Sequence, residues 1–164
     1  MCTSGAGRAV AHGWGMIPPK TILVPTDFSQ AAAVALDYAV ELAEKLGSKL
    51  LVMHAFELPL VGFPGGTMSI TAEMATRITV AAQKALDDIV AKHETRGVEL
   101  VTALVQGDPR EAVLTKAEEV GADLIVMGTH GRRGIARALI GSVAESVVRT
   151  SSIPVLTLRE ARDT

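Results

Sequence analysis

The sequence predicts an α/β fold of the Rossmann-like type: a doubly wound, five-stranded parallel sheet with strand order 3-2-1-4-5 and helices on both faces. Three observations support this prediction. Five short apolar runs, rich in Val, Leu and Ile, alternate with longer segments of helical periodicity. The chain of 164 residues is long enough for one domain with a sizeable core. Its residues are 48% hydrophobic but only 3% aromatic, so the core must be aliphatic.

The first strand is expected at residues 21–24, a β-branched apolar run that ends before a Pro-Thr-Asp turn. A helix is expected over residues 30–46, because alanine and leucine recur there at helical spacing. Ser29 is placed to cap the start of this helix and Gly47 to end it. The second strand is expected at residues 49–56, which completes the strand–helix–strand unit of a parallel sheet.

The middle of the chain begins with residues 57–68, which contain two prolines and a Gly-Gly pair and are predicted to be an irregular loop. A long helix is expected over residues 71–93 and a third strand over residues 98–105. Asp108 and Pro109 then predict a helix start, with Asp108 as the N-cap and Pro109 at the first helical position.

The last third of the chain repeats the alternation. The helix that begins at Pro109 is expected to stop at Gly121. The fourth strand is expected at residues 123–127. Residues 128–141 read as a glycine-punctuated loop, after which Ser142 is expected to cap a short helix. The fifth strand is expected at residues 154–158.

The predicted strand order makes the first and fourth strands neighbours, with connections that leave toward opposite faces of the sheet. In doubly wound sheets, ligands bind at this switch point, beyond the carboxyl ends of the strands. The topology alone therefore indicates two segments as the site: the turn formed by Pro25, Thr26 and Asp27, and the loop that begins at Gly128.

The loop after the fourth strand combines several features of a polyphosphate site. Its glycines permit close approach of a ligand to the backbone, and it carries Arg132, Arg133 and Arg137. It leads into a helix start near Ser142, where free N–H groups and the helix dipole favour phosphate. The alternative is a long surface loop whose glycines only permit turns. The chain has no P-loop motif and no GxGxxG after the first strand, which argues against P-loop NTPases and NAD(P) dehydrogenases.

Composition and charge restrict the remaining possibilities. The formal net charge of -2 argues against nucleic-acid binding through bulk charge. Cys2 is the only cysteine, so no intrachain disulfide can form. No apolar run approaches the ~18–20 residues of a membrane helix, and residues 1–14 lack a signal-peptide pattern, which favours the cytoplasm. We expect residues 1–19 to be a disordered extension, residues 20–160 the folded domain, and residues 161–164 a tail.

Four segments resemble the universal stress protein family, namely ILVPTDFS at residues 22–29, LVMHAF at 51–56, GADLIVMGTHG at 121–131 and GSVAESVVRTSSIPVL at 141–156. The ATP-binding branch of that family carries the pattern G-x2-G-x9-G-[ST]. Gly128, Gly131, Gly141 and Ser142 fit this spacing in full. The resemblance covers residues 20–159, and the segment before them lies outside it.

This resemblance implies an ATP-binding protein of the adenine nucleotide alpha hydrolase-like fold, with Mg²⁺ or Mn²⁺ arriving with the phosphates and no direct metal ligand in the chain. Asp27 would contact the ribose hydroxyls, and the backbone of Ala55 would read the adenine edge. The nucleotide-binding residues that the resemblance implies are Pro25, Thr26, Asp27, Ala55, Gly128, Thr129, His130, Gly131, Arg132, Arg133, Gly134, Gly141, Ser142, Val143 and Ala144. It also implies a homodimer through the strand at residues 154–158, an uncharged edge that favours pairing.

Several residues keep more than one interpretation. Asp27 could contact a ribose, cap the first helix, or do both. His54, inside an apolar strand, is predicted to be a hydrogen-bonded structural residue rather than a catalytic one. His130 could shape the backbone of the glycine loop or contact the nucleotide. His93 lies at a helix end and is assigned no role.

The predicted function is a nucleotide-responsive stress or regulatory module that holds ATP and reports to an unidentified protein partner, without nucleic acid or membrane. Hydrolysis is expected to be slow at most, because no Walker-type lysine or good general base for phosphoryl transfer is evident. One alternative is an ATP-hydrolysing or adenylyl-transferring enzyme of related fold, although PTDFSQ stands where those enzymes carry an SGG-type loop. Another is a nucleotide-independent interaction protein, against which the glycine spacing counts.

Overall fold

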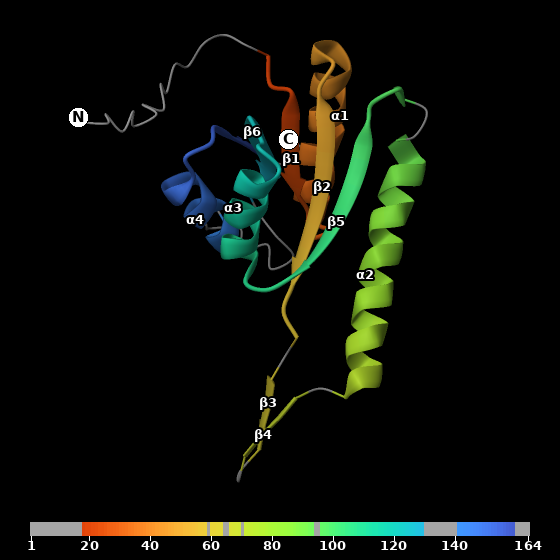
Figure 1. The fold of residues 1–164 in the computed structure, drawn as a ribbon, viewed down its shortest axis with the longest axis vertical. Helices are drawn as coiled ribbons and strands as arrows, with labels where there is room; N and C mark the ends of the chain where they lie inside the picture. Colours follow the sequence, from red (N-terminus) through yellow and green to blue (C-terminus); the bar gives the residue numbers. More distant parts are fainter. Residues whose placement is uncertain are drawn as a thin grey trace, which may run out of the picture.

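Figure 1 shows the fold of the computed structural model, which describes residues 18–58, 60–63, 66–69, 71–93, 96–129 and 141–159. Five parallel strands form the central sheet in the order β5-β2-β1-β6-β7. This is the 3-2-1-4-5 arrangement that the sequence predicts, so that prediction is confirmed. The strands of this sheet are β1 (Thr21–Pro25), β2 (Lys49–Phe56), β5 (Leu100–Gln106), β6 (Leu124–Gly128) and β7 (Val155–Leu158).

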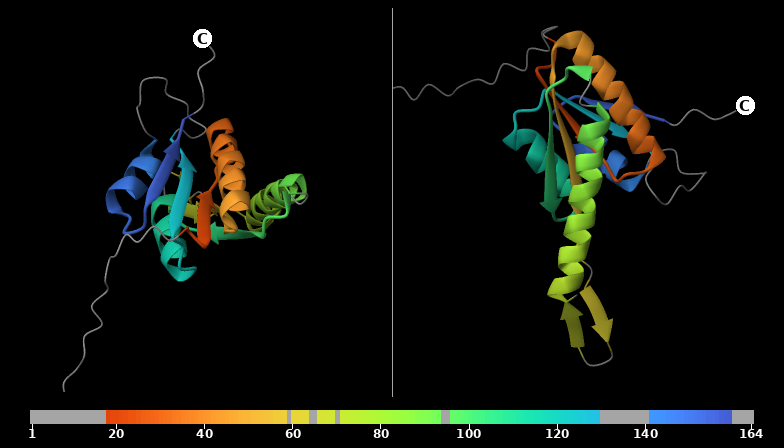
Figure 2. Two further views of the ribbon diagram at one scale, coloured as in Figure 1. Left: turned by 90° about the horizontal axis from the view of Figure 1, so that it is seen from above. Right: turned by 90° about the vertical axis from the view of Figure 1, so that its right-hand side faces the viewer.

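Helices cover both faces of the sheet (Figure 2). One face carries α1 (Gln30–Leu46) and α2 (Ala72–His93). The other face carries α3 (Pro109–Glu119) and α4 (Ser142–Thr150). A parallel sheet needs a crossover between successive strands, and right-handed crossovers from strands on either side of the switch point place the helices on opposite faces.

The core consists of two aliphatic clusters separated by the sheet. Ile22 and Val24 pack with α1 and α2, whereas Leu23, between them, packs with α3 and α4. Successive residues of a strand point to opposite faces, so β1 contributes to both clusters. All three side chains are fully buried, which is typical of a central strand in a parallel sheet. The core therefore fixes the position of β1 in the centre of the sheet.

Most helix ends lie where local signals predict them. Ser29 caps α1 by accepting a hydrogen bond from the Ala32 amide at 3.3 Å. Gly47 ends the helix in the left-handed conformation, with a φ of 67°. Asp108 caps α3 by accepting a hydrogen bond from the Arg110 amide at 2.8 Å.

The predicted cap of α4 is wrong by one residue. Gly141 is the N-cap, with extended backbone, and Ser142 is the first helical residue, without a side-chain capping bond. The physical reason is a tertiary hydrogen bond: the Gly141 amide donates to the Thr129 carbonyl, which holds Gly141 outside the helix. Serine is the better cap in isolation, but this contact decides where the helix begins.

The segment after β2 also differs from the prediction. Residues 57–68 are predicted to be an irregular loop, but β3 (Leu60–Phe63) and β4 (Gly66–Ser69) form an antiparallel hairpin there. The hairpin stands away from the central sheet, next to the start of α2 (Figures 1 and 2). Strands of four residues that contain glycine give no clear periodicity, so their pairing is decided by the hydrogen bonds that each supplies to the other.

Candidate functional site

β1 and β6 are neighbours in the sheet, and their carboxyl ends lie at the same edge. Ile22 pairs with Leu124, and Leu23 pairs with Ile125. The turn after β1 and the segment after β6 therefore meet at the switch point, where the topology predicts a ligand.

Gly128, the last residue of β6, lies directly against the first turn of α1. A Cβ atom on Gly128 would lie 2.7 Å from the carbonyl carbon and oxygen of Ala31 and 3.0 Å from the Ala32 nitrogen. These distances leave no room for a side chain, so glycine is required between β6 and α1. This packing brings the start of the glycine-rich loop against the helix that follows Asp27.

The turn between β1 and α1 is held by a series of side-chain-to-backbone hydrogen bonds. Thr26 Oγ1 accepts from the Phe28 amide, and Asp27 Oδ1 accepts from the Ser29 amide, each at 3.0 Å. The Thr26 amide donates to the Met53 carbonyl of β2 at 2.8 Å. The suggestion that Asp27 caps α1 is wrong, because Ser29 is the cap and Asp27 supports the Ser29 backbone instead. Ribose contact by Asp27 stays a prediction.

Phe28 and His54 fix the shape of the same turn. Phe28 has a φ of 63°, which is uncommon for a residue with a side chain. Its ring lies against the ring of His54, with centroids 4.4 Å apart. His54 Nδ1 lies 2.7 Å from the Thr26 carbonyl oxygen and must donate, because a carbonyl only accepts. The predicted hydrogen-bonded structural role of His54 is confirmed, whereas sequence reasoning missed Phe28, whose residue type carries no signal for positive φ.

Thr129 joins the end of β6 to the start of α4. Its carbonyl accepts from the Gly141 amide, and its own amide donates to the Leu158 carbonyl of β7 at 2.8 Å. Thr129 is buried, with an exposed fraction of 5%. The residues on either side of the glycine-rich loop are therefore held together at the carboxyl end of β6.

The first turn of α4 presents backbone donors. The Glu145 amide makes the first intrahelical bond, to the Gly141 carbonyl at 2.8 Å. The amides of Ser142, Val143 and Ala144 precede it, and among the described residues no side chain caps this helix. Such a helix start carries a partial positive charge and attracts anions.

Most of the predicted site residues that the structure describes lie at this one edge. Pro25, Thr26 and Asp27 form the end of β1 and the turn after it. Ala55 lies near the carboxyl end of β2, which runs parallel to β1. The structure brings them together with Gly128, Thr129, Gly141, Ser142, Val143 and Ala144. The remaining predicted residues lie outside the described part of the chain: His130, Gly131, Arg132, Arg133 and Gly134.

No group of three or more His, Cys, Asp or Glu side chains that could hold a metal ion occurs in the described part of the chain. Nor does any helix within it have the length and apolar character needed to cross a membrane.

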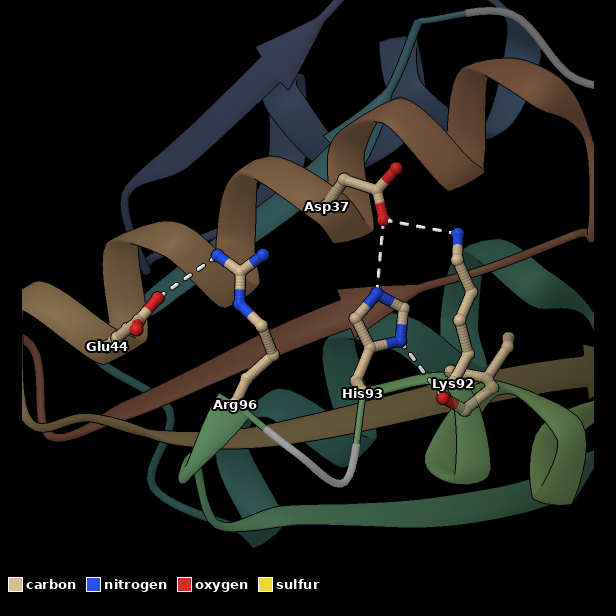
Figure 3. Close-up of polar contacts among 6 residues, drawn as sticks. Asp37, Glu44, Lys92, His93 and Arg96 are labelled. Atoms are coloured by element: carbon tan, nitrogen blue, oxygen red, sulfur yellow. Dashed lines mark hydrogen bonds and ion pairs between the residues drawn. The ribbon is translucent and has the colours of Figure 1, made fainter.

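A second polar cluster lies between α1 and α2 (Figure 3). Asp37 Oδ1 lies 3.1 Å from His93 Nε2 and 3.5 Å from Lys92 Nζ. His93 Nδ1 lies 3.0 Å from a backbone carbonyl of α2 and must donate there, because a carbonyl only accepts. Arg96 pairs with Glu44 at 3.0 Å nearby. These contacts tie the end of α2 to α1, and His93, to which the sequence assigns no role, is buried among them.

Comparison with known proteins finds relatives of similar sequence and solved structures of similar fold. Universal stress protein MJ0531 of Methanocaldococcus jannaschii is 32% identical over 145 residues, a match that covers 87% of this chain and 84% of that protein. Two similar solved structures are complexes with nucleotides. A universal stress protein in complex with cAMP is 30% identical, with a TM-score of 0.60, over 87% of this chain and 98% of that chain.

The universal stress protein from Archaeoglobus fulgidus in complex with dAMP is 26% identical, also with a TM-score of 0.60, over 87% of this chain and 98% of that chain. The family model described as "Universal stress protein family" matches residues 18–159, from the start of the described fold to its last residue. The chain therefore belongs to the universal stress protein family.

Proposed function

We propose that this chain binds an adenine nucleotide, ATP with Mg²⁺ or Mn²⁺, at the carboxyl ends of β1 and β6. The observation that carries the proposal is the convergence of Asp27, Gly128 and the start of α4 at one edge of the sheet. The cAMP and dAMP complexes of two similar family members support an adenine nucleotide as the ligand class.

The adenosine half of the ligand suits the turn after β1. A carboxylate only accepts hydrogen bonds, so Asp27 is suited to the ribose hydroxyls, which donate them. Pro25 and Thr26 would form the wall beside the sugar, and the backbone of Ala55 would contact the adenine edge. Gly128 would lie beside the ribose, where the absence of a side chain keeps the space open.

The phosphate half suits the start of α4. The amides of Ser142, Val143 and Ala144 are donors at the positive end of a helix dipole, a donor set that fits phosphate oxygens. Thr129 and Gly141 join the ends of the loop. Mg²⁺ or Mn²⁺ would be held chiefly by the phosphates. Five further residues, which lie outside the described part of the chain, would complete the phosphate site: His130, Gly131, Arg132, Arg133 and Gly134.

The role that follows is a cytoplasmic, nucleotide-responsive regulator with at most slow ATP hydrolysis. Slow turnover is expected because the sequence offers no Walker-type lysine or good general base for phosphoryl transfer, and because Asp27 Oδ1 is tied into the turn by the Ser29 amide. Binding with little turnover suits a module that signals nucleotide occupancy to a protein partner. This role rests on the resemblance of the sequence to the family together with the geometry of the turn.

The first test of the proposal is thermal unfolding with Mg-ATP, with Mg-GTP as the control. At a ligand concentration of ~100 times Kd, binding adds about 2.7 kcal/mol to the free energy of unfolding. For a domain of this size, the melting temperature should rise by roughly 5–10 °C. No shift, together with no nucleotide in the supernatant of the denatured protein by HPLC, would rule out nucleotide binding. Rapid release of ADP would favour the enzyme alternative.

Homodimerisation through β7 is part of the proposal, because β7 is an uncharged strand at the sheet edge. The bonds from Ile125 to Pro154 and from Thr129 to Leu158 place alternate residues of β7 toward β6. The backbone groups of Thr157 therefore face the open edge.

Proline at position 157 would remove an outward N–H without breaking the sheet itself. Thr157→Pro should halve the mass measured by light scattering. Thr102→Pro is the matched control, because the Leu50 amide bonds to the Glu99 carbonyl and so the Thr102 amide faces outward on the opposite edge strand, β5. Wild-type protein that is monomeric, or a Thr157→Pro protein that stays dimeric, would contradict an interface through β7.

A further inference from the structure

We propose that His54 is a positioning residue for the candidate nucleotide site, which aims the Asp27 carboxylate by holding the residues on either side of it. The inference rests on the proposed nucleotide-binding function. It assigns to a side chain of β2, outside the predicted ligand contacts, the task of setting the geometry of the turn after β1. The evidence is a set of contacts around Thr26 and Phe28.

β2 holds Thr26 through both of its backbone polar groups. The regular pairing of β1 with β2 ends at Pro25 and Met53. One residue later, the Thr26 amide donates to the Met53 carbonyl at 2.8 Å, and the Thr26 carbonyl accepts from His54 Nδ1 at 2.7 Å. The imidazole of His54 therefore adds one side-chain hydrogen bond to the backbone pairing of β1 with β2, one residue beyond its regular end. Thr26 is 8% exposed, so water has little access to replace this bond.

His54 also holds the residue that follows Asp27. The Phe28 ring lies against the imidazole, with centroids 4.4 Å apart and an angle of 42° between the planes. Phe28 has a φ of 63°, a conformation that a residue with a side chain adopts only when surrounding contacts impose it. Its amide is bound by Thr26 Oγ1 at 3.0 Å. The ring contact and this hydrogen bond together hold Phe28 in its unusual conformation.

Asp27 therefore lies between Thr26 and Phe28, both of which contact His54. Its Oδ1 atom accepts from the Ser29 amide at 3.0 Å, so the direction of the carboxylate depends on the backbone of the whole turn. Without His54, the Thr26 carbonyl would lose its donor and Phe28 would lose the ring that favours its positive φ. The backbone of the turn would then relax, and Asp27 would no longer be aimed at a ribose. His54, which is not among the predicted ligand contacts, would in this way control the part of the ATP affinity that depends on the ribose hydroxyls.

The test compares His54→Leu, which removes both donor and ring, with His54→Gln, which keeps an N–H donor but loses the ring. Val113→Ala is the control, because Val113 is buried in α3 on the other face of the sheet and its truncation lowers stability elsewhere. The first readout, taken without nucleotide, is amide hydrogen exchange of Phe28 and Ser29 by NMR. The second is the affinity for ATP and for 2′,3′-dideoxy-ATP by calorimetry.

For His54→Leu we expect exchange at the Phe28 and Ser29 amides to accelerate about tenfold or more relative to the amides of β2. Affinity for ATP should fall about tenfold, toward that for dideoxy-ATP, while affinity for dideoxy-ATP stays constant. His54→Gln should fall between His54→Leu and wild type. Val113→Ala should change neither the exchange of the turn nor the ratio of the two affinities. A merely structural role for His54 would lower both affinities equally.

Unchanged exchange at the turn in both His54 variants would overturn the inference, as would equal losses of ATP and dideoxy-ATP affinity. If His54→Leu fails to fold, His54→Gln decides by the same two readouts. Wild-type protein that binds neither nucleotide would overturn the proposed function and, with it, the ribose half of this inference. The exchange comparison would still decide, independently, whether His54 holds the turn.

Discussion

The turn between β1 and α1 and the start of α4 lie at the same sheet edge, but they satisfy their backbone groups in different ways. In the turn, Thr26, Asp27 and Ser29 each accept a backbone amide through a side-chain oxygen. In α4, Gly141 occupies the cap position, and within the described part of the chain no side chain binds the first amides. In the turn, side-chain oxygens bind the amides of Phe28, Ser29 and Ala32, whereas the first amides of α4 have no side-chain partner among the described residues.

This difference matches the two halves of the proposed ligand. A nucleoside is neutral, so its recognition depends on shape and on acceptors held in fixed positions, which a turn held by side-chain hydrogen bonds provides. A phosphate chain is anionic and is bound best by unpaired backbone donors and a helix dipole. Substitutions in the turn should therefore act through stability and geometry, whereas substitutions at the start of α4 should act through charge.

The largest effect is expected from Ser142→Asp, which adds charge at the start of α4. A carboxylate about 5 Å from a phosphate should cost about 3 kcal/mol at an effective dielectric constant of about 20, so the affinity for Mg-ATP should fall ~100-fold or more. Protein stability should stay unchanged or rise by about 0.3–1 kcal/mol, because an acidic residue favours the first turn of a helix. Calorimetric titration and thermal unfolding measure the two quantities.

Ser142→Asn is the neutral control and should keep affinity within a few-fold of wild type. Equal affinities for Ser142→Asp and Ser142→Asn would show that the start of α4 does not bind phosphate. The two regions would then not divide the ligand between them as proposed.

A smaller effect, on stability and affinity together, is expected at Gly128, where β6 packs against the first turn of α1. Gly128→Ala places a methyl group 2.7 Å from the Ala31 carbonyl, so β6 or α1 must shift, and the free energy of unfolding should fall by about 1–3 kcal/mol. Affinity for ATP should fall as well, because the shift moves the turn relative to the loop. Urea unfolding and calorimetry measure these changes.

Gly121→Ala provides the contrast. Gly121 has a φ of 60°, and a Cβ added there would meet no atom within 4 Å, so alanine should cost about 1 kcal/mol through backbone strain while leaving ATP affinity intact. If Gly128→Ala is as stable as wild type, the close packing of β6 on α1 is not a constraint on the site.

The smallest effects are expected from two serines at helix starts, Ser29 before α1 and Ser142 in α4. Ser29→Ala should lower the free energy of unfolding by about 1 kcal/mol, because it removes the cap of α1. Ser142→Ala should change it by less than about 0.5 kcal/mol, because Ser142 is the first helical residue and makes no capping bond. Chemical denaturation of both variants measures the difference. Equal losses would mean that both helix starts depend on side chains.

Local chemistry explains what could be predicted for the fold. The cap at Asp108 and the end of α1 at Gly47 follow from side chains and backbone preferences within a few residues of each other. The strands follow from apolar runs, and the sheet order follows from their alternation with helices under the rule of right-handed crossovers. The switch point, and hence the place of Asp27 and Gly128, came from that topology.

The sequence by itself therefore determined the order of the strands and helices of the central sheet, most helix ends and the edge at which a ligand is predicted to bind, because each depends on local periodicity or on chain connectivity. Only the tertiary structure decided the contact of His54 with Thr26, the positive φ of Phe28 and the pairing of His93 with Asp37. These contacts join residues on different elements, or depend on such a contact. Which side chains meet is fixed only when sheet register and helix packing place them.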